Sequence, residues 1–145
     1  MKKIHFYEIN KKSYLKNKRG LKSFILDLFK NEGKGIDNIG FIFCSDKFLL
    51  SLNKSFLKHD YYTDTLSFTL SGQSQNIKGE IYISVDRVKD NAKKFHSTYQ
   101  TELIRVMIHS SLHLCGYQDS DETAKHKMIN HQETYINQWL VSRET

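Results

Sequence analysis

The sequence predicts an α+β fold, a single domain in which about four strands form a mixed α/β sheet covered by helices. The chain has 145 residues, which is the size of one domain. Segments with strand-like alternation and segments with helical periodicity follow one another in the order β-α-β-α-β-β-α-α-α. Hydrophobic residues make up 39% and charged residues 26% of the chain, a balance typical of a folded protein rather than a disordered one. We therefore treat residues 1–145 as one domain.

The first half of the chain is expected to supply two strands and two helices. Residues 2–8 alternate polar and apolar side chains, as an opening strand does. Residues 17–30 carry apolar side chains at helical spacing, and residues 39–44 are almost wholly apolar, which predicts a short buried strand. The serine or the aspartate at 45–46 can cap a following helix that continues through residues 53–57.

The second half of the chain is expected to form a hairpin and three helices. Residues 65–70 and 79–85 alternate as strands do, and the glycine- and serine-rich stretch 71–76 predicts a turn between them. Helical periodicity then predicts helices at residues 86–95, 98–115 and 121–140.

Charge and cysteine content narrow the class of protein. The net charge is +6 and the pI is near 9.2, which favours an anionic partner such as nucleic acid, although excess lysine also keeps proteins soluble. No apolar run approaches the roughly 20 residues that span a bilayer, and the first residues form no signal-peptide core, so a cytoplasmic location away from membranes is expected. Cys44 and Cys115 lie in apolar segments and are expected to be buried thiols.

The most informative stretch is 109–119, which reads His-x-x-x-His-x-x-Gly-x-x-Asp. His109 and His113 lie four residues apart, so a helix places both imidazoles on one side. Gly116 can end that helix and turn the chain back, which brings the carboxylate of Asp119 near as a third ligand. Two imidazoles and a carboxylate suit one Zn²⁺ or another divalent ion, and leave a fourth position for water, as in catalytic sites.

Other interpretations of this stretch have to be weighed. A pair of histidines at this spacing also occurs by chance on helices. The same spacing is found in zinc endopeptidases, where a general-base glutamate follows the first histidine, but here that residue is Ser110. A metallopeptidase is therefore disfavoured. His126 and His131 lie too far along the chain for the ligand spacing and are expected at the surface.

The predicted ligand helix is apolar over most of its circumference, so it is expected to be central and largely buried. Its exception is the stripe that contains His109 and His113. Arg105 and Glu102 project close to this stripe, one and two turns earlier respectively. They could orient the site or meet a phosphate, and the alternative is an ion pair within the helix.

Three segments of the sequence resemble one family. His109-Ser-Ser-Leu-His-Leu-Cys-Gly-Tyr-Gln-Asp119 resembles the motif His-Gly-x-Leu-His-Leu-x-Gly-Tyr-Asp-His of the YbeY family of bacterial rRNA maturation factors. Leu52-Asn53, with Asp60 and the segment 63–68, is similar to that family's Leu-Asn and Thr-Asp-Val-Leu-Ser-Phe. The segment 79–84 is similar to its Gly-Asp-Ile strand. The order of these motifs and the chain length also agree.

The resemblance implies a metal-dependent, single-strand-specific endoribonuclease that acts in rRNA processing, at the 16S rRNA 3′ end, and in ribosome quality control. The implied partners are rRNA and the small ribosomal subunit, with a ribosomal protein or a ribosome-associated GTPase as further partners. The metal would be held by His109, His113 and Asp119. Asp64 is implied to lie near the metal, where it could orient a ligand histidine; its alternative role is a cap at the start of a strand.

The sequence departs from the family motif at two positions. Asp119 stands where the family usually has a third histidine, which keeps a workable ligand set but changes the charge of the site. Leu57 stands where the family commonly has an arginine linked to RNA cleavage or binding. Lys54, Lys58 or Arg105 are candidates to supply the missing positive charge. A protein of another class, a non-catalytic ribosome-assembly factor that binds rRNA or a ribosomal protein, remains the alternative.

Overall fold

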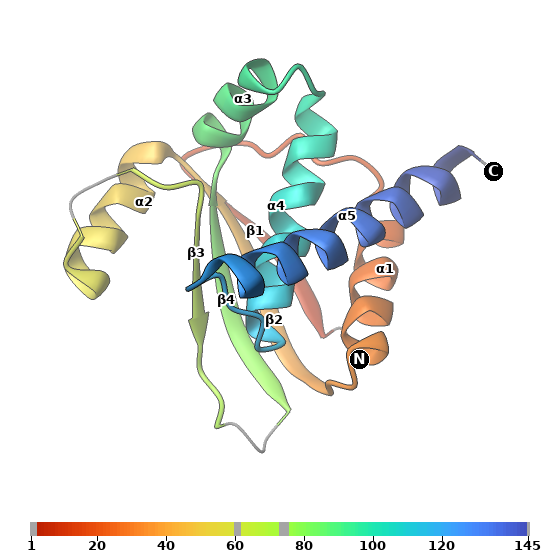
Figure 1. Ribbon diagram of the computed structural model, residues 1–145. Helices are drawn as coiled ribbons and strands as arrows, with labels where there is room; N and C mark the ends of the chain where they lie inside the picture. Colours follow the sequence, from red (N-terminus) through yellow and green to blue (C-terminus); the bar gives the residue numbers. More distant parts are fainter. Residues whose placement is uncertain (1–2, 60–61, 73–75, 145) are drawn as a thin grey trace.

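The computed structural model describes residues 3–59, 62–72 and 76–144. Asp60 and residues 73–75 of the expected turn lie outside the described residues. The elements follow the predicted order (Figure 1). They are β1 (Ile4–Ile9), α1 (Lys18–Asn31), β2 (Ile36–Cys44), α2 (Asp46–Leu52), the π-helical turn η1 (Asn53–Leu57), β3 (Thr65–Thr69), β4 (Ile77–Ser84), α3 (Val85–Lys94), α4 (Tyr99–Leu114) and α5 (Glu122–Glu144).

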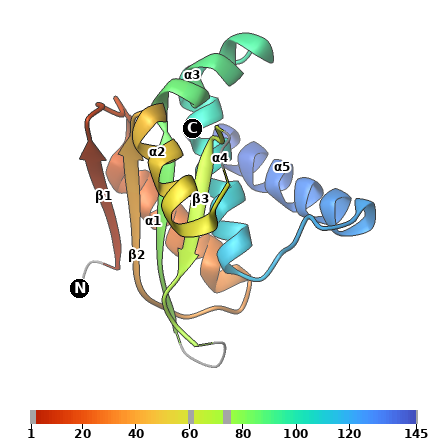
Figure 2. The same ribbon diagram turned by 90° about the vertical axis from the view of Figure 1, so that its left-hand side faces the viewer.

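The four strands form one mixed sheet in the order β1-β2-β4-β3, which confirms the predicted α+β class. The pairs β1/β2 and β2/β4 are parallel, and β3/β4 is the predicted antiparallel hairpin. Helices α1, α4 and α5 lie on one side of the sheet, whereas α2 and η1 lie on the other side (Figures 1 and 2). We call these two sides of the sheet the inner face and the outer face.

The main core lies between the inner face and helices α1, α4 and α5. Phe41 and Phe43 of β2 are fully buried there, as are Leu103, Met107 and Leu112 of α4. Helix α4 is thus central and buried, as its sequence predicts. A smaller cluster of Cys44, Leu49 and Leu66 packs α2 onto the outer face.

The boundaries of several elements differ from the predicted ones, for example β2 and β4, which begin at Ile36 and Ile77, and the differences at α5 and after α2 have physical reasons. Helix α5 runs to Glu144 rather than residue 140, because neither a proline nor a glycine follows residue 121 to end it. After α2 the chain widens into the π-helical turn η1, which ends at Lys58 with a φ of 57°. Periodicity alone does not distinguish such a turn from an α-helix.

Two further expectations concern the burial of the cysteines and membrane-spanning helices. Cys44 and Cys115 are free and buried, as predicted. Burial raises the pKa of each of these thiols to about 12. Among the helices that the structure describes, none is long and apolar enough to cross a membrane.

Candidate metal centre

Helix α4 presents the two predicted ligands and ends where the sequence predicts. Its first turn is capped by Thr98, whose side chain accepts a hydrogen bond from the N–H of Thr101. Its end is closed by Gly116, which has a φ of 106° and donates its N–H to the carbonyl of His113 at 3.0 Å. A residue with a Cβ would be strained in this conformation. The glycine therefore turns the chain back and brings Asp119 towards the histidines.

The three predicted ligands converge. The Nε2 atoms of His109 and His113 lie 3.1 Å apart, and Oδ2 of Asp119 lies 3.6 Å from Nε2 of His113. One donor atom from each residue falls within 4.8 Å of the others. Two nitrogens bonded to one tetrahedral ion at 2.0 to 2.1 Å are about 3.3 Å apart, so the spacing of the histidines fits a single ion. The donor types fit Zn²⁺ or a similar divalent ion.

Hydrogen bonds set the tautomer of both histidines. Nδ1 of His109 lies 2.7 Å from Oε1 of Gln132, whose amide nitrogen donates to Glu133 at 2.9 Å. The amide oxygen therefore accepts, and His109 carries its proton on Nδ1. Nδ1 of His113 donates in the same way to the backbone carbonyl of Tyr117 at 3.1 Å. Both Nε2 lone pairs are thus free for an ion.

An ion-pair network of Glu133, Arg105 and Glu102 holds the side chain of Gln132 in place. Glu133 accepts from Nε and Nη2 of Arg105 at 3.0 and 3.1 Å. Arg105 also pairs with Glu102 on its own helix, and Glu102 is 4% exposed. This confirms the ion pair expected within the helix. Burial raises the pKa of Glu133, but hydrogen bonds from Arg105 and Gln132 outweigh it and lower the pKa overall.

The electrostatics of the site favour the neutral imidazole of His113. The pKa of His113 is lowered from its ordinary value, first by burial and then by the neighbouring His109. The hydrogen bond that His113 donates to the backbone carbonyl of Tyr117 and the charge of Asp119 raise this pKa, but they are weaker. His113 is therefore unprotonated at neutral pH, which is the form that binds metals.

A half-buried carboxylate fixes the turn that carries Asp119. Glu32, at the end of α1, accepts hydrogen bonds from the hydroxyls of Tyr117 at 2.7 Å and Tyr135 at 2.6 Å. The ring of Tyr117 also lies 5.0 Å from that of His131. His131 is therefore half-buried, and its expected surface position is wrong because α5 crosses the turn at this point. His126 is exposed, as predicted.

Known proteins resemble this chain over nearly its whole length. A family model described as Endoribonuclease YbeY matches residues 4–140. The chain belongs to the YbeY family. The Endoribonuclease YbeY of Cytophaga hutchinsonii is 42% identical over 86% of this chain and 87% of its own length. That of Karelsulcia muelleri is 38% identical over 91% of this chain and 92% of its own. The solution structure of TM1509 from Thermotoga maritima has a TM-score of 0.70 and is 30% identical, covering 97% of this chain and 92% of that protein.

The remaining residues that the YbeY resemblance implies lie in several places. Among the described residues, the Nδ1 atoms of the two ligand histidines bond to Gln132 and Tyr117 rather than to Asp64. The backbone carbonyl of Asp64 accepts from Ser84 at 2.9 Å, at the start of β3. Lys54, Leu57 and Lys58 are exposed on and after η1.

Two serines that follow His109 have structural contacts. Ser110 hydrogen-bonds to Thr65 of β3 at 2.9 Å, and Ser111 donates to the carbonyl of Met107 at 2.8 Å. Ser110 stands where zinc endopeptidases have the general-base glutamate. Here its side chain takes part in the contact between α4 and β3, through the bond to Thr65. Ser111 bonds to the backbone of its own helix.

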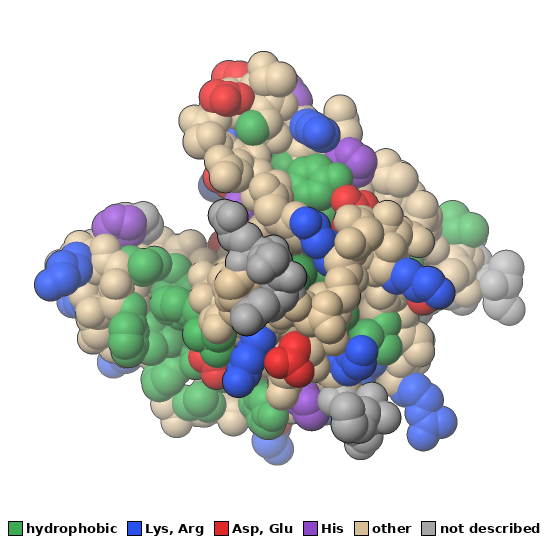
Figure 3. Space-filling view, turned by 90° about the horizontal axis from the view of Figure 1, so that it is seen from below, with side chains coloured by type: hydrophobic (Ala, Val, Ile, Leu, Met, Phe, Trp, Pro, Cys, Tyr) green, Lys and Arg blue, Asp and Glu red, His purple; other side chains and the backbone are tan. Residues whose placement is uncertain are grey.

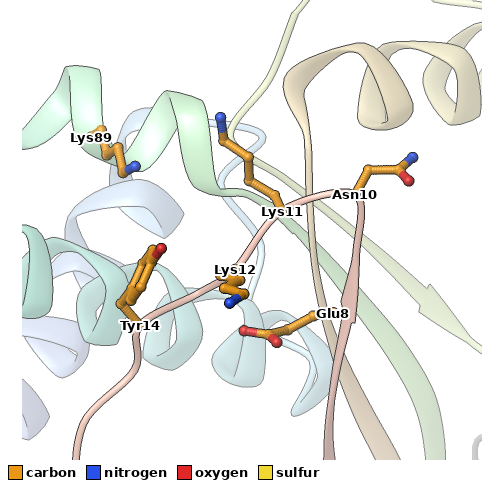
Figure 4. Close-up of a pocket in the computed structure, with 6 residues that line it drawn as sticks. All are labelled: Glu8, Asn10, Lys11, Lys12, Tyr14 and Lys89. Carbon is orange, nitrogen blue, oxygen red and sulfur yellow. The ribbon is translucent and has the colours of Figure 1, made fainter.

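A pocket separate from the three predicted metal ligands is basic, because three lysines line it (Figure 4). It lies where the chain leaves β1 and meets α3, and it shares no residue with the ligand set. Its lining consists of Glu8, Asn10, Lys11, Lys12, Tyr14 and Lys89. Lys11 is engaged by Asp86 at 2.9 Å, so only part of its charge is available to another anion.

Gln132 is the functional residue that sequence reasoning missed. It lies on α5, 23 positions from His109, and no spacing rule connects the two. The signal in the sequence was its spacing, because Gln132 lies four residues from both Met128 and Ile136, on the apolar stripe of α5. The structure places it there with 8% exposure. A buried amide needs partners, and here the partners are His109 and Glu133.

Proposed function

We propose that this protein is a metal-dependent endoribonuclease that cuts single-stranded RNA. The observation that carries the proposal is the convergence of His109, His113 and Asp119 in a chain whose relatives are named endoribonucleases. We further propose Zn²⁺ as the ion and rRNA, at the 16S 3′ end, as the substrate of a cytoplasmic protein. Ribosome quality control and contacts with a ribosomal protein or GTPase belong to the same proposal.

The ion would be held by the two Nε2 atoms and by the carboxylate of Asp119. When bound, it supplies Lewis-acid chemistry for phosphodiester hydrolysis. The protein's own residues position the three ligands. Gln132 and the carbonyl of Tyr117 hold the imidazoles in the metal-binding tautomer, and Glu32 fixes the turn that carries Asp119. The ligands are half-buried or exposed, so an RNA strand can reach them.

The charge of the protein supports a polyanionic substrate. The net charge of +6 promotes association with phosphates, and this attraction weakens with salt. Lys54 and Lys58 are exposed next to Leu57, where the family commonly has an arginine. We propose that they contact the RNA backbone. Arg105 is engaged by two carboxylates, so a phosphate would have to compete with Glu102 and Glu133 for it.

The test compares His113→Ala with wild-type protein and with the matched control His126→Ala, which removes an exposed histidine. Zinc affinity and cleavage of a single-stranded rRNA fragment are measured on proteins purified away from host nucleases. We expect His113→Ala to lose both and His126→Ala to keep both. Cleavage that persists in His113→Ala would contradict the proposal. Intact RNA with normal rRNA binding by wild-type protein would support the assembly-factor alternative instead.

A further inference from the structure

The outer face of the sheet carries aromatic side chains in register. The strand pairing places His5, Gly40, Glu80 and Phe68 in one row across β1, β2, β4 and β3. The next row contains Tyr7, Ile42, Tyr82 and Leu66. Alternation along the strands directs these side chains away from the main core. Each row therefore combines rings with polar or aliphatic groups.

Two aromatic rings at this face are open to solvent, one in the rows and one on the neighbouring turn η1. Tyr7 is 52% exposed and Phe56 of η1 is 67% exposed, whereas Phe68 and Tyr82 are half-buried. Figure 3 shows hydrophobic side chains gathered on the side of the molecule where α2 lies, with basic side chains at the border. A folded protein leaves an exposed patch of this kind mainly at a binding surface.

The rings form a connected series. The centroids of Phe56 and Phe68 are 6.1 Å apart, and those of Phe68 and Tyr82 are 5.8 Å apart. At the opposite edge of the same face, Tyr7 stacks on His5 at 6.1 Å with an interplanar angle of 14°. The rings thus hold one another in fixed orientations, which lowers the entropy cost of binding a planar ligand.

Gly40 gives Tyr7 its position. A Cβ at residue 40 would lie 3.4 Å from Cε2 and 3.8 Å from Cδ2 of Tyr7, so the ring leans over the glycine. The sheet backbone supports one side of this ring. Because half of the side chain is exposed, the other side is available for stacking.

Charge favours nucleic acid over protein as the occupant. Lys78 lies on the outer face two residues before Glu80, and Lys47 and Lys54 are exposed on α2 and η1. Glu80 is the acidic residue in the two rows, and its carboxylate accepts a hydrogen bond from the hydroxyl of Tyr82 at 3.2 Å. Cores of protein–protein interfaces are depleted of charged residues, whereas single-strand nucleic-acid sites combine aromatic rings with cations.

The edge strand β3 connects this face to the candidate metal centre. Its inner side touches α4 through the bond between Thr65 and Ser110, which adjoins His109. Its outer side carries Phe68. A single strand that passes over this edge would therefore reach both sites.

We propose that the outer face binds the bases of single-stranded RNA by stacking on Phe56 and Phe68, beside the edge that adjoins the candidate metal centre, and on Tyr7 at the opposite edge of the sheet. This inference rests on the proposed function and specifies how the substrate is held. Stacking engages the flat face of any base, so the surface selects unpaired RNA and reads little sequence.

The test measures binding of a fluorescein-labelled oligouridylate by anisotropy, with a chelator present to prevent cleavage. Tyr7→Leu and Phe56→Leu each remove one exposed ring, and each is expected to weaken binding roughly fivefold or more. Tyr7→Phe keeps the ring and is expected to bind like wild type. Tyr14→Leu is the matched control, because Tyr14 is 66% exposed but lies in the separate basic pocket. Circular dichroism establishes that each variant is folded.

Four outcomes are decisive. Weakened binding in the two leucine variants alone supports the inference. Wild-type binding in both overturns it, and if cleavage still depends on His113 the proposed function stands without it. Self-association of wild-type protein that Tyr7→Leu abolishes, with RNA binding unchanged, also overturns it and assigns the face to protein contacts. If stacking is confirmed but the wild-type protein does not cleave RNA, the proposed function fails and the inference holds.

Discussion

Replacing Gln132 by leucine tests how the site is organised. The change removes the acceptor of the His109 Nδ1–H and the donor to Glu133, at 2.7 and 2.9 Å. Loss of such a partner typically lowers metal affinity by about 10- to 100-fold. Only one ligand is affected, since His113 keeps its bond to the carbonyl of Tyr117. We therefore expect a loss near the lower limit, about tenfold or ~1.4 kcal/mol.

The assay is competition for Zn²⁺ between the protein and a chromophoric chelator. Gln138→Leu, an exposed position further along α5, is the matched control and should bind zinc normally. Gln132→Glu keeps an acceptor for His109 but places a second carboxylate beside Glu133. This variant should retain zinc affinity while losing thermal stability. Gln132→Leu should also unfold more easily, by about 1 kcal/mol, because the half-buried Nδ1–H of His109 loses its acceptor.

A particular result would refute this reasoning. If Gln132→Leu binds zinc as tightly as wild type and Gln138→Leu does too, the tautomer of His109 does not depend on Gln132. The hydrogen bond would then be a consequence of packing between α4 and α5.

Three further predictions follow from the same structure. Asp119→His should keep zinc and Asp119→Ala should weaken it in the same competition assay; equal affinity in both would exclude Asp119 as a ligand. Burial raises the pKa of Glu32, but hydrogen bonds from two tyrosines outweigh it and hold the pKa below its ordinary value. The ionised group therefore stabilises the fold above its unfolded pKa, and this contribution is lost as the pH falls through the folded pKa. Urea unfolding should therefore lose stability at acidic pH less steeply in Glu32→Gln than in wild type, and parallel slopes would contradict this. Cys44 and Cys115 should react with a thiol reagent only after unfolding, and rapid reaction of the native protein would contradict their burial.

The sequence was sufficient where the determinants are local. Helical periodicity and Gly116 predicted where α4 runs and ends, and alternation predicted the hairpin of β3 and β4. The geometry of His109 and His113 followed from their spacing on one helix. Each of these features depends on residues close together in the chain.

Features that depend on the crossing of distant elements could not be predicted. The contact of Gln132 with His109 requires α5 to cross α4, and the half-buried place of His131 requires the same crossing. The bond between Glu32 and Tyr135 joins residues 103 positions apart. For Asp64, the sequence suggested a role as partner of a ligand histidine, but both Nδ1 atoms bond elsewhere. No local pattern specifies such contacts.

The most direct test of the central claim is the dependence of RNA cleavage on the metal. Wild-type protein is stripped with a chelator, assayed on single-stranded rRNA, and assayed again after one equivalent of Zn²⁺ per chain is restored. The account predicts that cleavage disappears on stripping and returns with zinc in wild type but not in His113→Ala. Cleavage that survives complete removal of the metal would contradict it.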